Sequence, residues 1–294
     1  MIVLAAGCAY APHSEPEILA RGHEIVASSG VKLSDVELGE RLRAAKVVYI
    51  GEQHSSANDH AAERELLEKI YATDASLAVG LEMLSRTMQK SIDDYLSGVF
   101  DEAQFLAAVD WKKTWGFDYA FYRPLFSFCR EHHLRMFALN LPREITHRVA
   151  KEGIAALSTE ERSLLPEIVS GPAAHRERIR QIFAAHPHVA AHGGPHGVAQ
   201  SPEESKEAFE RFYAAQLLWD ETMAEEIARA LASPDAPAKM LVVAGEMHVR
   251  RDAVVERATR RGVQPALIVL PLFARDLKPA RRENLADLYW VFLR

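Results

Sequence analysis

The side chains best suited to chemistry stand at the ends of short apolar segments. Glu52 and His54 end the run KVVYIGEQH, and Glu246 and His248 end the similar run MLVVAGEMH. A third apolar run, SLAVGLE, ends at Glu82. Two histidines and several carboxylates can bind a borderline divalent metal or relay protons. The repeated Gly-Glu-X-His pattern therefore predicts a shared catalytic pocket made of Glu52, His54, Glu82, Glu246 and His248.

These residues meet only if the apolar runs are neighbouring parallel strands. In open α/β sheets ligands bind beyond the carboxyl ends of the strands, where Asn140 and Arg143 are also expected. Within this pocket a divalent metal would be held by His54, His248 and Glu82. The ordinary alternative is that the two histidines hydrogen-bond each other or a carboxylate and simply tie loops together.

A second set of possible ligands stands in the segment HPHVAAHGGPHGVAQSP and in the helix predicted after it. The segment contains His186, His188, His192 and His196, which could bind a transition metal or haem. Histidines among glycines and prolines are also common in plain solvated loops. Tyr213 lies in the following helix, and a tyrosinate is a hard anionic ligand suited to ferric haem. For any single tyrosine, a half-buried hydroxyl with a backbone partner is the more ordinary role.

The elements that must position these residues alternate along the chain. We expect strands that begin near residue 46 and over 76–82, 134–140, 240–244, 264–270 and 288–293. Helices are expected over 33–45, 60–71, 203–231 and 251–261, and from Arg143 onward. Ser34 is a plausible cap for the first helix, and Asn58 or Asp59 for the second. This alternation predicts an α/β fold with a mostly parallel sheet flanked by helices.

Two regions contain more helix than simple crossovers need. Residues 85–130, which are rich in aromatic side chains, and residues 151–235 are expected to form an inserted helical subdomain at the C-terminal edge of the sheet. Residues 31–84, 131–150 and 236–294 then make up the α/β domain. Residues 1–30 are expected to be a signal segment and linker, with a peripheral strand as the alternative for 9–30.

Composition excludes several classes of protein. The 294 residues are 48% hydrophobic and 26% charged, which is ordinary for a globular chain. The net charge of −6 disfavours nucleic-acid binding. There is no P-loop, no dinucleotide-binding glycine loop and no Gly-X-Ser-X-Gly motif, so an NTPase, a dehydrogenase or a serine hydrolase is not expected.

Cys8 closes an apolar start, MIVLAAGC, that looks like the end of a lipoprotein signal peptide. On this interpretation Cys8 carries the lipid, and the protein is anchored to the outer membrane or cell envelope, exposed to the periplasm or the surface. The match is imperfect because no basic residue precedes Cys8 and the apolar run is short. The alternative is an apolar N-terminus on a cytoplasmic protein.

Taken together, several segments make the chain resemble the ChaN family of haem-binding lipoproteins, in the wider erythromycin esterase/ChaN/Tiki superfamily. The segments are YIGEQH, VGLEM, ALNLPRE, AQLLWDETMA and VVAGEMHVR, in that order along residues 46–250. The resemblance implies an α/β domain with a helical subdomain and a role in haem and iron uptake. It further implies a homodimer with haem at the interface, a tyrosine as axial ligand and histidine near the propionates.

The resemblance does not fix which tyrosine binds the iron. Tyr213 is the first choice, and the histidines of 186–196 could supplement or replace it. The wider superfamily also includes metal-dependent hydrolases with paired Gly-X-X-H motifs. A hydrolase that uses the strand-end pocket is therefore the alternative function, although a haem-binding protein is preferred over an enzyme.

Overall fold

The computed structural model describes residues 19–185 and 202–294, and within them one eight-stranded sheet organises the chain. The strand order is β2-β1-β8-β7-β3-β6-β4-β5. The strands are β1 (Gly22–Ala27), β2 (Lys32–Leu33), β3 (Val47–Glu52), β4 (Leu77–Ser85), β5 (Arg135–Asn140), β6 (Lys239–Gly245), β7 (Ala266–Phe273) and β8 (Leu288–Leu293). Pairing is parallel from β8 to β5, whereas β1 pairs antiparallel with both β8 and β2. The mostly parallel α/β fold is thus confirmed.

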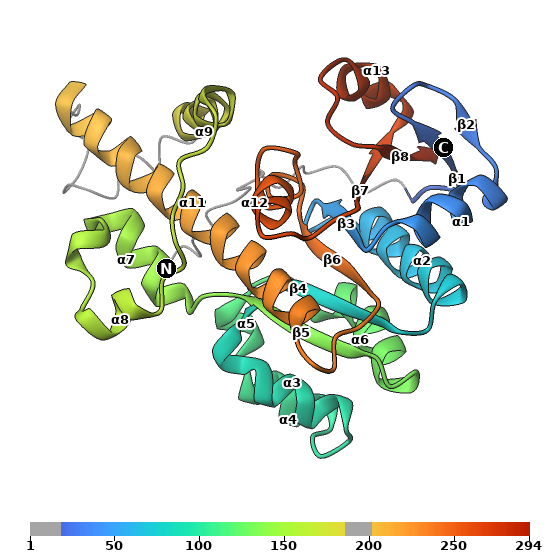
Figure 1. Cartoon of the computed structure of the whole chain (residues 1–294), viewed down its shortest axis with the longest axis horizontal. Helices are drawn as coiled ribbons and strands as arrows, with labels where there is room; N and C mark the ends of the chain where they lie inside the picture. The colour runs from blue at the N-terminus through green and yellow to red at the C-terminus, as the bar shows by residue number, and fades with distance from the viewer. Residues whose placement is uncertain (1–18, 186–201) are drawn as a thin grey trace.

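Helices cover both faces of this sheet (Figure 1). They are α1 (Asp35–Ala44), α2 (Ala57–Thr73), η1 (Arg86–Met88), α3 (Gln89–Leu96), α4 (Glu102–Ala108), α5 (Trp111–Thr114), α6 (Tyr119–Glu131), α7 (Arg143–Glu152), η2 (Ile154–Ala156), α8 (Thr159–Ser163), α9 (Ala173–Ala185), α11 (Pro202–Ala232), α12 (Val254–Arg260) and α13 (Ala274–Arg282). Helix α13 was not expected from the sequence, because its polar, arginine-rich stretch contains Pro279 and buries only Ala280.

The alternation of side chains along β3 separates two hydrophobic cores. Val48 and Ile50 face a core shared with α1, α2 and α6. Val47 and Tyr49 face the core that contains α11 and α12. Successive side chains of a strand point to opposite faces, so a strand buried on both sides reads as a continuous apolar run. The same alternation places Glu52 on the face of α2 and α6.

Capping residues fix where the first two helices begin. Ser34 caps α1 in a capping box with Glu37, as predicted. The cap of α2 is Ser56, so the prediction of Asn58 or Asp59 was wrong. Asp59 instead accepts hydrogen bonds from the Gln53 amide and the Ser56 hydroxyl, both at 2.9 Å. It thereby secures the turn between β3 and α2.

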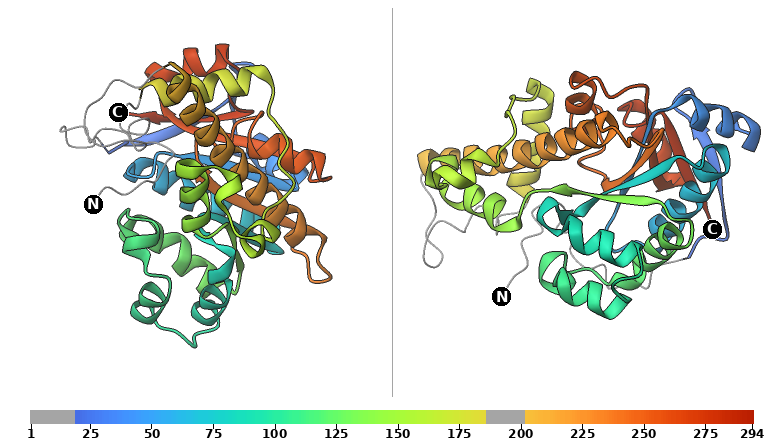
Figure 2. Two further views of the ribbon diagram at one scale, coloured as in Figure 1. Left: turned by 90° about the vertical axis from the view of Figure 1, so that its left-hand side faces the viewer. Right: turned by 60° about the horizontal axis from the view of Figure 1, so that its bottom comes forward.

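The other helices that contact the sheet fall into two groups (Figure 2). Helices α3 to α6 form one group, whose aromatic side chains are buried in the same core as Val48. Helices α7, α9 and the 31-residue α11 form another group. Among the described residues, no helix is both long enough and apolar enough to cross a bilayer.

Candidate functional site

The two Gly-Glu-X-His segments lie side by side, although most of the chain separates them. Strands β3 and β6 pair in parallel with Glu52 opposite Gly245. The Glu246 amide donates to the Glu52 carbonyl over 3.0 Å and so continues the pairing beyond the strand ends. The repeated motif therefore predicted the geometry correctly: His54 and His248 both follow the carboxyl ends of adjacent strands.

His54 is held by Glu52 in a buried dyad. Its Nδ1 donates to Glu52 Oε1 over 2.6 Å, and the Tyr122 hydroxyl donates to the same oxygen over 2.6 Å. Trp115 Nε1 in turn donates to the Tyr122 hydroxyl over 2.9 Å. Burial opposes ionisation of Glu52, but the hydrogen bond from His54 and its charge lower the pKa of Glu52 to about 2. Burial likewise opposes protonation of His54, yet Glu52 raises its pKa.

His248 forms a second dyad, with Asp220 of α11. Its Nδ1 donates to Asp220 Oδ1 over 2.7 Å, and its Nε2 lies 3.5 Å from Glu82 Oε1. Burial works against the imidazolium, but the charge of Glu82 and the hydrogen bond to Asp220 raise the pKa of His248 to about 9. In both dyads Nδ1 is engaged by a carboxylate, which fixes the ring orientation and leaves Nε2 free of that partner; His248 Nε2 is buried, whereas His54 lines the pocket described below.

Glu82 and Gly245 bring the two dyads together. Glu82 Oε2 accepts the Gly245 amide over 2.6 Å. A Cβ atom on Gly245 would stand 2.9 Å from His54 Cε1 and 3.5 Å from Glu82 Oε2. Glycine is required here because the imidazole of His54 lies directly against the backbone at this position.

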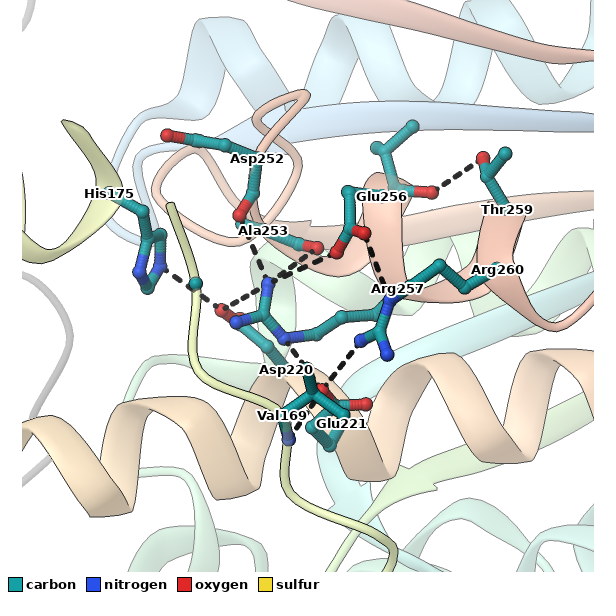
Figure 3. Close-up of polar contacts among 12 residues, drawn as sticks. Val169, His175, Asp220, Glu221, Asp252, Ala253, Glu256, Arg257, Thr259 and Arg260 are labelled. Atoms are coloured by element: carbon teal, nitrogen blue, oxygen red, sulfur yellow. Dashed lines mark hydrogen bonds and ion pairs between the residues drawn. The ribbon is translucent and has the colours of Figure 1, made fainter. Parts of the chain in front are cut away.

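Asp220 is also held in place by a network of charged side chains (Figure 3). Figure 3 shows the guanidinium of the fully buried Arg257 between Asp220 and Glu221 of α11, with His175 of α9 on the other side of Asp220. Arg257 Nε lies 3.2 Å from Glu221 Oε1, and His175 Nε2 lies 3.6 Å from Asp220 Oδ2. Burial raises the pKa of Asp220, but hydrogen bonds from His175 and His248 lower it to about 2.

A pocket of about 510 Å³ opens in front of His54 and Glu82. Its apolar walls include Met83, Met88, Val109, Trp115, Leu141 and Trp219, and its polar lining includes His54, Glu82, Asp110, Lys113, Asn140, Arg143, Glu144 and His147. Lys113 and His147 are exposed, and in the described ranges neither Lys113 nor Arg143 forms an ion pair. A pocket of this size, with few polar groups among apolar walls, suits an organic ligand with negative charge.

The structure places the predicted residues in different surroundings. Glu52, His54, Glu82 and His248 come together, whereas Glu246 lies at the edge, half-buried. Tyr213 is buried with Phe209 and Phe183, and its hydroxyl accepts the Gly171 amide over 3.2 Å. It does not line the 510 Å³ pocket. The histidines His186, His188, His192 and His196, and Cys8, lie outside the described residues.

Three buried residues near the dyads were not anticipated. Asp220, His60 and Glu63 sit inside predicted helices, where nothing in the local sequence distinguishes them from surface positions. Within the described chain, Glu52, His60 and Glu63 form the set whose possible ligand atoms all lie within 4.8 Å of one another. The predicted metal set His54, His248 and Glu82 does not appear in such an arrangement.

Comparison with protein families gives the decisive observation. The family described as haem-binding uptake, Tiki superfamily, ChaN, matches residues 38–258, which include both Gly-Glu-X-His segments. The chain belongs to this family. The match confirms the resemblance seen in the sequence and covers β3 to α12, the elements that build the pocket.

Individual relatives are more distant. The chain is 26% identical over 271 residues to the chloroplastic protein RETICULATA-RELATED 5 of Arabidopsis thaliana, covering 85% of this chain but only 34% of that relative. ChaN of Campylobacter jejuni, solved with cofacial haem, superposes with a TM-score of 0.70 at 17% identity and covers 95% of this chain and 100% of ChaN. The erythromycin esterase EreC gives a TM-score of 0.47 at 14% identity over 81% of this chain and 72% of EreC.

Proposed function

We propose that the protein binds haem in the 510 Å³ pocket and serves haem or iron uptake. The observation that carries the proposal is the composition of this pocket in a chain of the haem-binding family. Its tryptophan, methionine and leucine side chains suit the faces of a porphyrin. Lys113 and Arg143, which have no carboxylate partner among the described residues, suit the two propionates.

His147 and His54 are the imidazoles of the pocket that could reach iron. His147 is exposed on α7, whereas His54 is buried and already bound to Glu52. A neutral imidazole is a common axial ligand of haem iron. We therefore assign His147 as the ligand within the described chain. Tyr213 and the histidines of 186–196 remain the competing prediction.

A hemin titration tests both the site and the ligand. We expect a saturable Soret band for the wild-type protein. For His147→Ala we expect a shifted band and about tenfold weaker affinity, because the contacts of the apolar walls and of the propionates would remain. Lys113→Ala should weaken binding without moving the band. Lys151→Ala, an exposed lysine on α7 outside the pocket, is the matched control. If Tyr213→Phe moves the band and His147→Ala does not, the ligand assignment is wrong. Absence of saturable binding would refute the proposed function.

Membrane attachment through Cys8 is a separate part of the proposal. The N-terminal segment MIVLAAGC, which is similar to the end of a lipoprotein signal peptide, supports a lipoprotein of the cell envelope. Metabolic labelling with a palmitate analogue should modify the wild-type chain but not Cys8→Ser. Equal labelling of both, or of neither, would contradict lipidation at this residue.

Hydrolysis is the second candidate function, and one observation favours it. Two histidines are each oriented through Nδ1 by a buried carboxylate, and the Nε2 of His248 lies 3.5 Å from Glu82 Oε1. Such pairs can act as general acids and bases. Turnover of a generic ester that is abolished in His248→Gln would support an esterase. Unchanged turnover in that variant would exclude the dyads from the reaction.

A further inference from the structure

A second cluster of buried ligands lies behind the His54 dyad, away from the pocket lining. It consists of Glu52 at the end of β3 and of His60 and Glu63 in the first half of α2. Their side chains are at most 4% exposed. His60 Nδ1 lies 3.0 Å from Glu63 Oε2 and 3.6 Å from Glu52 Oε2.

The tautomer of His60 follows from its other nitrogen. Nε2 lies 3.2 Å from the carbonyl oxygen of His54, which can only accept a hydrogen bond. Nε2 therefore carries a proton. In the neutral ring, Nδ1 then presents its lone pair to two carboxyl groups. The ring itself is fixed because it stacks on Phe121 and meets Tyr122 edge-on.

The carboxyl groups also present free oxygens. Glu52 Oε1 is occupied by His54 and Tyr122, but Glu52 Oε2 and Glu63 Oε1 are fully buried and have no hydrogen-bond partner. The other ionisable groups facing the cluster are Asp59, the Tyr122 phenol and His54. Of these only His54 can carry a positive charge, and it is engaged with Glu52 Oε1, so no positive group is paired with Glu63. Buried carboxylates without a compensating positive group are costly.

We propose that Glu52, His60 and Glu63 bind a divalent cation, with zinc as the best fit. Zinc takes imidazole nitrogen and carboxylate oxygen at about 2.0–2.2 Å, which places tetrahedral ligand atoms about 3.4 Å apart. The separations of 3.0 and 3.6 Å bracket that value. A zinc-bound histidine usually donates its second nitrogen to a carbonyl or carboxylate, as His60 does to His54.

This site would be linked to the pocket but distinct from it. Glu52 is shared: Oε2 belongs to the cation cluster and Oε1 holds His54. The cation would join β3 to α2 directly behind the dyad. The proposal does not depend on haem binding, because none of the three ligands lines the pocket.

The alternative to a bound cation is a single proton shared by Glu63 and Glu52. One variant distinguishes a proton from a cation at this place. Burial and the charge of Glu52 raise the pKa of Glu63 well above its usual value, so a protonated Glu63 is chemically reasonable. Glutamine has the shape of protonated glutamate. Glu63→Gln should therefore be tolerated if a proton is the occupant, but should abolish a zinc site.

The experiment measures zinc in chelator-stripped, reconstituted full-length protein by mass spectrometry of the metal, together with the melting temperature. We expect one zinc per chain and a zinc-dependent rise in melting temperature. Glu63→Gln should weaken zinc binding by about 100-fold or more, because even outer-shell changes cost 10- to 100-fold. Glu68→Gln, an exposed carboxylate on the same helix, should bind zinc normally, as should His248→Gln.

Three results would overturn the proposal. They are a wild-type protein that binds no stoichiometric zinc, zinc retained in Glu63→Gln, and zinc lost equally in His248→Gln. The last result would move the ion to the pocket. If Glu63→Gln does not fold, His60→Gln serves as the second variant with the same expected and contrary outcomes.

Discussion

At the scale of single residues, the two dyads use the same arrangement with different partners. Glu52 comes from the strand itself, two residues before His54, whereas Asp220 comes from the middle of α11. The first partner could be predicted from the motif. The second could not, because only the packing of α11 against β5 and α12 brings residue 220 to residue 248.

His248 gives the stability of the protein a defined pH dependence. Its pKa is about 9 in the folded chain against 6.5 for a free histidine. Because the folded pKa is higher, the stabilisation is complete below about pH 6.5 and is lost as pH rises through 9. The loss is on the order of 3 kcal/mol. Urea unfolding at pH 6 and pH 9 should show this decrease in the wild-type protein.

The variant His248→Gln provides the control for this prediction. Glutamine keeps a polar group near Asp220 but does not titrate, so the difference between pH 6 and pH 9 should shrink by most of that amount. An equal loss of stability in both proteins would assign the pH dependence to other groups, such as His54.

At the scale of elements, the close packing of β3 against β7 and the loop after β6 depends on Gly51. A Cβ atom there would meet Val249 Cγ2 at 2.5 Å, Leu270 Cδ2 at 2.6 Å and the Glu246 backbone at 3.0 Å. Such contacts are shorter than packed atoms allow, so side chains or backbone would have to move. Gly51 and Gly245, the glycines that precede Glu52 and Glu246, are therefore needed because a side chain at either position would clash with its neighbours.

We expect Gly51→Ala to destabilise the protein by about 1–3 kcal/mol, the usual cost of overpacking a core. Gly22→Ala in β1 is the matched control, because a Cβ atom there meets nothing within 4 Å. Its effect should be within about 0.5 kcal/mol. Urea unfolding measures both. Equal effects of the two substitutions would show that the neighbours of Gly51 yield without cost.

The sequence predicted the elements better than it predicted the groups behind the site. Strands β3, β4 and β6 were recognisable because burial on both faces requires continuous apolar runs, and their ends carry polar residues. His60 and Glu63 were not recognisable as a pair. Their i,i+3 spacing on α2 matches an exposed ion pair equally well, and only the contact of this helix with Glu52 reveals their burial.

At the scale of the whole molecule, the pocket offers a testable link between haem and assembly. The rim of the pocket has exposed side chains, among them Lys113 and His147. A porphyrin bound there would therefore leave part of its apolar surface exposed to solvent. A second copy of the chain could cover that surface, and burial of apolar area favours association. We therefore expect hemin to shift the protein from monomer to dimer.

Analytical ultracentrifugation with and without hemin measures this shift. The wild-type protein should sediment as a dimer only when loaded, and His147→Ala should need a higher hemin concentration for the same change. Lys151→Ala should behave like the wild type. A haem-loaded protein that stays monomeric would disprove the link.

The position of β6 between β3 and β4 has a consequence for synthesis on the ribosome. Strands β3 and β4 emerge early, but they never pair with each other, and the strand that joins them is translated only at residues 239–245. Until then both nascent strands keep open edges, which are prone to wrong pairing. The growing polypeptide should therefore depend on chaperones until its last third has left the exit tunnel, and the two histidines should meet only then.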